Sequence, residues 1–158
     1  MKLIDNLAHQ PSGSLKEAYP AIRNLLRTHS VQIADQPLLS GLQVSSQLSD
    51  FIDDFIRSLY LYFTQQDKQT CRTAVVAVGG YGRKHLQLYS DIDLLFLVEK
   101  SRPEAEALAQ KILYALWDLK LDIGHSTRTI KNCIAFAHEE VQFKTSLVPH
   151  RLIAGDTE

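Results

Sequence analysis

The sequence is poor in the features that mark secreted, membrane and nucleic-acid-binding proteins. Its 158 residues include only two cysteines, Cys71 and Cys133, which are too few for a disulfide framework and lack the spacing of a metal site. No stretch approaches the roughly 18 uninterrupted apolar residues of a membrane span, and the N-terminus lacks the apolar core of a signal peptide. These absences predict a protein of the reducing cytoplasm with no membrane partner.

Charge of one sign is also missing. There are 17 basic and 18 acidic residues, which gives a net charge of −1. No overall field therefore attracts the chain to nucleic acid, and any recognition of phosphate has to be local. Hydrophobic residues make up 45% of the chain and charged residues 22%, a composition typical of a globular domain with a core.

The most informative stretch lies between residues 74 and 97. An apolar run rich in β-branched residues ends at Gly79 and Gly80, and a second apolar run begins at the aspartates Asp91 and Asp93. This pattern predicts a strand, a glycine turn, a short helix and a second strand. Glycines before a helix also let backbone N–H groups approach an anion, so we expect a phosphate site at this turn.

Asp91 and Asp93 should lie on one face of the second strand, because successive side chains of a strand point to opposite faces. Two carboxylates ~4 Å apart in a medium of effective dielectric constant about 20 repel each other by about 4 kcal/mol. A cation would relieve this repulsion, and carboxylate oxygens suit Mg²⁺. The sequence therefore predicts a magnesium site beside the phosphate site.

The first 70 residues are predicted to be a helical extension that packs on a core formed by residues 71–158. One helix is expected over 15–30, interrupted by Pro20, and a strongly amphipathic one over 48–63. The apolar and aromatic stripe of the second helix is interpreted as core. Its acidic residues Asp50, Asp53 and Asp54 are expected largely on the solvent side.

The remaining elements complete an α+β pattern. A helix is predicted to end near residue 119, a third strand to cover 121–130, and two final helices to cover 131–138 and 141–154. We expect a small β-sheet of three strands, flanked by helices.

Four motifs carry a resemblance to a known family. They are the segment Gly79-Gly80-Tyr81-Gly82-Arg83, the segment Ser90-Asp91-Ile92-Asp93, the Gly-His-Ser-x-Arg-Thr strand that begins at Gly124, and the Arg-Leu-Ile-Ala-Gly-Asp segment that begins at Arg151. Together they resemble the N-terminal nucleotidyltransferase domain of the bifunctional PII uridylyltransferase/uridylyl-removing enzymes, within the polymerase-β-like nucleotidyltransferase superfamily. The matches run from about residue 72 to 156. The resemblance implies the fold of this superfamily, an α+β fold with a small mixed β-sheet.

The resemblance implies transfer of UMP from UTP to a tyrosine of the PII nitrogen-regulatory signal protein, with release of pyrophosphate. Asp91 and Asp93 would be the catalytic and metal-binding residues and would hold Mg²⁺. Gly79, Gly80, Arg83 and Ser90 would bind the nucleotide phosphates. Two alternatives stay open: a nucleotidyltransferase of the same fold with another acceptor, and a non-catalytic module that binds a nucleotide or a partner.

The sequence leaves several residues undecided. Many members of the superfamily place a third carboxylate on the third strand, and Asp122 is the nearest candidate here. Arg128 is expected either to reach the phosphates or to pair with an acid, and Lys84 either to take part or to be solvated. His125 is interpreted as a packing residue.

Overall fold

The structure is a computed structural model that describes residues 14–67, 72–100 and 103–155. Cys71 lies outside these residues, and Cys133 is buried and free. None of the described helices has an apolar stretch long enough to cross a lipid bilayer. In chain order the described elements are α2 (Ser14–Ala34), α3 (Gly41–Asp67), β1 (Thr73–Ala77), α4 (Gly79–Gly82), β2 (Ile92–Val98), α5 (Pro103–Asp118), β3 (Ile123–Thr129), α6 (Ile130–Glu139), α7 (Val141–Leu147) and β4 (Arg151–Ala154).

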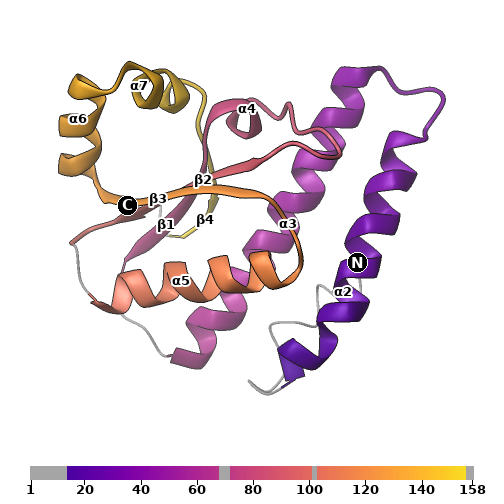
Figure 1. The fold of residues 1–158 in the computed structure, drawn as a ribbon, viewed down its shortest axis with the longest axis horizontal. Coiled ribbons are helices and arrows are strands. Elements are labelled where there is room, and N and C mark those ends of the chain that lie inside the picture. The colour runs from indigo at the N-terminus through magenta and orange to yellow at the C-terminus, as the bar shows by residue number, and fades with distance from the viewer. Residues whose placement is uncertain (1–13, 68–71, 101–102, 156–158) are drawn as a thin grey trace.

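The described strands form one mixed sheet in the order β3-β2-β1-β4 (Figure 1). β1 runs antiparallel to β2 and to β4, while β2 and β3 are parallel. Parallel strands need a crossover connection, and α5 provides it between β2 and β3. The α+β class predicted from the sequence is confirmed, with one more strand than expected.

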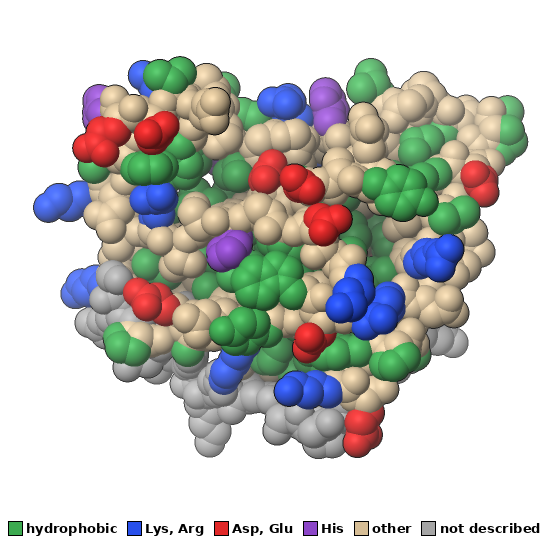
Figure 2. All heavy atoms as spheres, in the orientation of Figure 1, with side chains coloured by type: hydrophobic (Ala, Val, Ile, Leu, Met, Phe, Trp, Pro, Cys, Tyr) green, Lys and Arg blue, Asp and Glu red, His purple; other side chains and the backbone are tan. Residues whose placement is uncertain are grey.

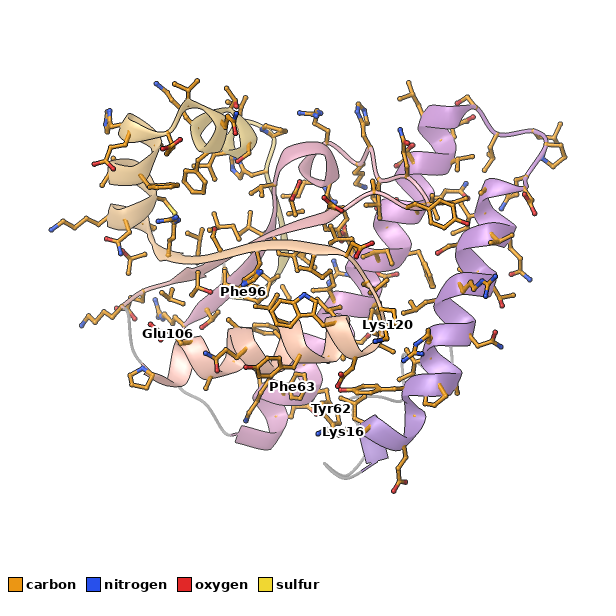
Figure 3. All side chains as sticks on the ribbon, in the orientation of Figure 1. Lys16, Tyr62, Phe63, Phe96, Glu106 and Lys120 are labelled. Atoms are coloured by element: carbon orange, nitrogen blue, oxygen red, sulfur yellow. The ribbon has the colours of Figure 1, made fainter. Side chains whose placement is uncertain are left out.

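Helices cover both faces of the sheet (Figure 1). On one face, side chains such as Val75, Leu94 and Phe96 pack with α2, α3 and α5 in the larger core cluster. Phe96 is fully buried and lies between the sheet and α5 (Figure 3). On the other face, Val76 and Leu95 pack with residues of α6 and α7. Because successive side chains of a strand point to opposite faces, the strands contribute to two separate apolar layers.

Two helix predictions are wrong. The helix expected over 141–154 is a short helix, α7, followed by the strand β4. Pro149 explains the break, because a proline inside a helix lacks the N–H donor and its ring clashes with the preceding turn. Pro20, in contrast, does not interrupt its helix, since α2 continues through it to Ala34. Leu15 and Ile22 on either side of this exposed proline are buried in the core, and their packing holds the helix together.

Candidate functional site

The glycine turn between β1 and β2 is built as the sequence predicts. β1 ends at Ala77, and α4 is a single turn that starts at Gly79. Gly79 has a φ of 61°, a left-handed conformation that favours glycine. A β-carbon added to Gly79 would lie 2.9 Å from Oδ2 of Asp93, so the turn also has to be a glycine to leave room for this carboxylate. The first N–H groups of such a turn have no acceptor inside it.

Asp93 is the second residue of β2 and is half-buried, whereas Asp91 precedes the strand and is exposed. Burial raises the pKa of the Asp93 carboxyl above its ordinary value, and the negative charge of Asp91 raises it further. Within the described residues neither carboxylate has a hydrogen-bond or ion-pair partner. Two interacting carboxylates without a counter-charge fit a divalent cation.

Asp93 is enclosed on its other side by β3. It pairs with Gly124 in the parallel register of β2 and β3. A β-carbon added to Gly124 would lie 2.4 Å from Oδ1 of Asp93, closer than any real contact. The carboxylate is thus held between Gly79 and Gly124, with one oxygen facing each glycine.

The structure does not bring Asp122 into a three-carboxylate site. Asp122 is exposed just before β3, and its main-chain oxygen accepts a hydrogen bond of 2.9 Å from the N–H of Ile92. Among the residues that the structure describes, no group of three His, Cys, Asp or Glu side chains is placed to hold a metal ion. Any ion at Asp91 and Asp93 therefore takes its remaining ligands from substrate or water.

Arg83 and Ser90 lie at the two ends of the loop between α4 and Asp91. Arg83 is exposed, and its terminal nitrogen lies 3.9 Å from the position of a β-carbon added to Gly80, so the guanidinium folds back over the glycine turn. The Ser90 hydroxyl accepts a hydrogen bond of 2.9 Å from the N–H of Gln87 and donates one of 3.3 Å to the carbonyl of the same residue. In this structure Ser90 closes the turn that leads to Asp91, and its contact with phosphate stays a prediction.

A buried polar network behind the glycine turn was not foreseen. Asp53, expected toward solvent, is only 5% exposed. Its carboxylate accepts a hydrogen bond from the hydroxyl of Tyr81 and is paired with the guanidinium of Arg151. Arg151 also donates to the main-chain oxygens of Tyr81 at 3.0 Å and Gly82 at 3.1 Å.

This network joins α3, α4 and β4, so it fixes the glycine turn to the rest of the fold. Burial, and then the Asp53 carboxylate, raise the pKa of Tyr81 well above its ordinary value, so the phenol stays a donor. The sequence offered one signal. Ser49, Asp53, Ile56 and Tyr60 follow helical spacing, which places Asp53 between buried side chains of α3 rather than opposite them.

The undecided basic residues have partners of their own. Lys84 forms an exposed ion pair of 2.7 Å with Asp50. The guanidinium of Arg128 lies 3.9 Å from the ring centre of Phe136, and its Nε is buried without a hydrogen-bond partner. Arg128 is therefore held by a cation–π contact, and within the described residues it pairs with no acid.

Figure 2 shows acidic side chains gathered close to α4 and the neighbouring part of the sheet. An open depression of about 840 Å³ lies between the connection of α2 to α3 and the loop of residues 85–90, and its lining includes neither Asp91 nor Asp93. Ser90 forms part of its lining, so the depression begins one residue from Asp91. A volume of this size is typical of small-molecule sites.

Comparison with known proteins agrees with this geometry. The sequence model of the nucleotidyltransferase domain family matches residues 58–148. The chain is similar to proteins named bifunctional uridylyltransferase/uridylyl-removing enzyme. It is 49% identical to the one from Cereibacter sphaeroides over 85 residues, which are 53% of this chain and 9% of the relative. Identity is 40% over 124 residues with the one from Caulobacter vibrioides, covering 74% of this chain and 13% of the relative.

A third relative, from a Bradyrhizobium species, is 37% identical over 166 aligned positions, which cover 97% of this chain and 18% of the relative. The chain thus spans less than a fifth of the length of the curated relatives it matches. The family match includes β1, the glycine turn, both aspartates and β3. This chain belongs to the nucleotidyltransferase domain family.

Proposed function

We propose that this chain is the part of a cytoplasmic uridylyltransferase that transfers UMP from UTP to a tyrosine hydroxyl of the PII nitrogen-regulatory signal protein. The phenolic oxygen forms a bond to the α-phosphorus of UTP, the bond from this phosphorus to the β-phosphate oxygen breaks, and pyrophosphate leaves. The phenolic proton passes to solvent. The names of the relatives, uridylyltransferase/uridylyl-removing enzyme, support the choice of the uridylyl group.

One observation carries the proposal. Asp93 is held between Gly79 and Gly124, beside Asp91, and no described residue neutralises the two charges. The carboxylates fit Mg²⁺ as cofactor, and Asp91 and Asp93 would be its protein ligands. Bound there, Mg²⁺ would supply charge neutralisation for the triphosphate and for the attacking oxygen.

The remaining site residues are assigned to the phosphates. Gly79 and Gly80 present backbone N–H groups at the start of α4, next to Asp93, where the β- and γ-phosphates would lie. Arg83 folds over the same turn and supplies a positive charge that can pair with phosphate oxygens. Ser90, which lines the 840 Å³ depression, would bind phosphate through its hydroxyl.

The experiment is a calorimetric titration of the chain with UTP, with and without Mg²⁺, and with ATP and CTP as competitors. Magnesium-dependent UTP binding that is lost in Asp91→Asn/Asp93→Asn supports the site, and labelling of PII protein by UTP then tests the acceptor. Transfer of UMP to another acceptor, but not to PII, would support the nucleotidyltransferase activity and contradict the proposed acceptor. A folded wild-type chain that binds no nucleotide at millimolar concentration contradicts the proposal.

A further inference from the structure

The outer edge of the sheet next to Asp93 is open. β3 is the terminal strand of the sheet, and Figure 1 shows it crossing in front of the other strands with no element drawn over it. The hydrogen bond from the N–H of Ile92 to the carbonyl of Asp122 fixes the parallel pattern, in which alternate residues of β3 turn their main-chain groups toward β2. The N–H and C=O groups of His125 and Thr127 therefore point away from the sheet. Among the described residues nothing pairs with them.

An exposed aromatic patch borders this open edge. We define the patch by three residues: Tyr114 and Trp117 of α5, which are 59% and 40% exposed, and His125 of β3. The ring of Trp117 lies 5.8 Å from that of Tyr114 and 5.4 Å from that of His125. Figure 2 shows hydrophobic side chains and a histidine gathered in the middle of this face, over α5 and β3. A contiguous exposed patch of this kind is typical of a binding surface.

The edge also lies on the correct side of the carboxylates for an acceptor. Asp93 turns one oxygen toward Gly79, where the leaving pyrophosphate is placed in the proposed reaction, and the other toward Gly124 in β3. In phosphoryl-type transfer the attacking and leaving oxygens are roughly in line across the phosphorus. With pyrophosphate placed on the Gly79 side, the proposed reaction places the attacking hydroxyl on the β3 side of Asp93.

Charges of both signs lie at the ends of the edge, because the exposed carboxylates of Asp118 and Asp122 accompany the lysine at the start of β3. Lys120 lies where α5 turns into β3, as Figure 3 shows, and Lys131 follows the strand by two residues; both side chains are exposed. An unpaired strand edge beside an aromatic patch suits an extended polypeptide that carries aromatic side chains, such as the tyrosine of the proposed acceptor.

We propose that the acceptor protein docks by adding its tyrosine-bearing segment, in extended form, to the free edge of β3, with side chains on the aromatic patch. The added strand bonds to the main-chain groups of His125 and Thr127. The patch lies on the α5 face of the sheet and Asp93 on the opposite face, so alternate side chains of the added strand cover the patch and deliver the tyrosine hydroxyl toward Asp93. The inference rests on the proposed function, because it takes the acceptor to be a polypeptide.

Trp117 makes the test direct, since it is the chain's single tryptophan. The probe is a tryptophan-free synthetic peptide that spans the acceptor tyrosine of PII protein, added without nucleotide. We expect the Trp117 emission to shift to shorter wavelength and to saturate as the ring is covered.

Two sets of N-methylated peptides distinguish strand addition from side-chain contact alone. One set is methylated at every second backbone nitrogen and the other at the alternate nitrogens. In an added strand only one set points its nitrogens at β3, so one set should lose at least 10-fold in affinity while the other stays within about 2-fold of the unmodified peptide. Tyr114→Ala should weaken binding several-fold, and Leu38→Ala, which truncates an even more exposed side chain in the connection between α2 and α3, should not.

Three results would overturn the inference. They are no binding of the unmodified peptide, equal binding of the two methylated sets, or peptide binding by anisotropy without any change at Trp117. Self-association of the chain that buries Trp117 and excludes the peptide would also overturn it, because the edge would then serve a second copy. None of these results touches magnesium-dependent UTP binding, so failure of the docking mode is distinguishable from failure of the proposed function.

Discussion

Gly124 and Asp93 face each other across the parallel pair β2 and β3, and the Asp93 carboxylate occupies the space that a β-carbon at Gly124 would need. The atom that a β-carbon at Gly124 would meet is a side-chain oxygen, not the backbone. The fold can therefore accommodate the larger residue by rotating Asp93, at the expense of the site. This separates the effect of a substitution on binding from its effect on folding.

Gly124→Ala should accordingly leave the fold intact and displace the Asp93 carboxylate from its position. We expect at least about a 10-fold loss of magnesium-dependent UTP affinity, the range seen when residues that orient metal ligands are changed. Unfolding in urea should change by less than about 1 kcal/mol. Calorimetry and urea titration of the same preparation check both expectations. Unchanged UTP affinity in a folded Gly124→Ala variant would show that the position of Asp93 does not matter.

Gly82→Ala should instead destabilise the fold. A β-carbon there would lie 2.1 Å from the main-chain oxygen of Pro149, which cannot rotate away. We expect a loss of about 1–3 kcal/mol in the free energy of unfolding, as for overpacked sites. Its effect is measured by urea denaturation beside that of Gly124→Ala. Equal destabilisation by the two substitutions would contradict this distinction between side-chain and backbone contacts.

Metal binding should weaken in mildly acidic solution. Burial and the charge of Asp91 raise the pKa of Asp93, and Mg²⁺ binds the ionised carboxylate. Affinity should be full above this raised pKa and should fall as the pH drops through it, starting at a higher pH than for an ordinary aspartate. In Asp91→Asn the charge of Asp91 no longer raises the pKa of Asp93. The pH at which half of the Mg²⁺ affinity is lost, the midpoint, should therefore be lower. Titration with Mg²⁺ alone over a pH series measures it, and Asp35→Asn, an exposed carboxylate of the connection after α2, should leave the midpoint in place.

Asp93→Asn should stabilise the metal-free chain at neutral pH. An acid whose pKa is raised in the folded state contributes most to stability when protonated and loses that contribution as the pH rises through the folded pKa. The neutral amide keeps the contribution at pH 7. We expect a gain of about 0.5–1 kcal/mol in unfolding free energy, a size common for relief of unfavourable surface charge. Urea unfolding in the presence of a chelator checks it, and a lower stability than wild type would contradict the like-charge account.

The pair of Asp53 and Arg151 should dominate the stability of the glycine turn. Arg151→Met leaves a nearly buried carboxylate without its counter-charge, and we expect a loss of about 3–5 kcal/mol. The double variant Asp53→Leu/Arg151→Met should recover part of this loss, because the buried charge is removed as well.

A matched control for the Arg151 pair is Lys84→Met. It breaks an ion pair whose side chains are 41% and 54% exposed, and it should cost less than about 1 kcal/mol. The double-mutant cycle is read from urea midpoints of all variants. Additive losses for Asp53 and Arg151 would show that the two side chains are not coupled.

The sequence was sufficient for the local features of the site. Glycines after a β-branched run specify a turn, because this depends on backbone geometry over a few residues. The shared strand face holds only in part, since Asp93 lies in β2 and Asp91 precedes it. The binding roles of Asp91, Asp93, Gly79, Gly80, Arg83 and Ser90 stay predictions, although the structure brings Gly79 and Asp93 into contact.

Long-range features were beyond this reasoning. The pairing of β4 with β1, the burial of Asp53 and the contact of Gly124 with Asp93 each join residues far apart in the chain. A carboxylate within an otherwise solvent-facing acidic cluster is expected to be exposed unless its distant partner is known. Arg151 is that partner, and it was assigned to a helix that the structure replaces with a strand.

The hydrogen bonds of Arg151 to the glycine turn also affect when this turn can reach its final structure during synthesis of the chain. A ribosome makes α3, β1, α4 and β2 well before it makes β4, so the carboxylates and the turn exist before the residue that secures them. Folding during translation must therefore wait for residue 151 to emerge before Asp53 and Tyr81 find their common partner. Until then the nascent chain carries the parts of the site without their final arrangement.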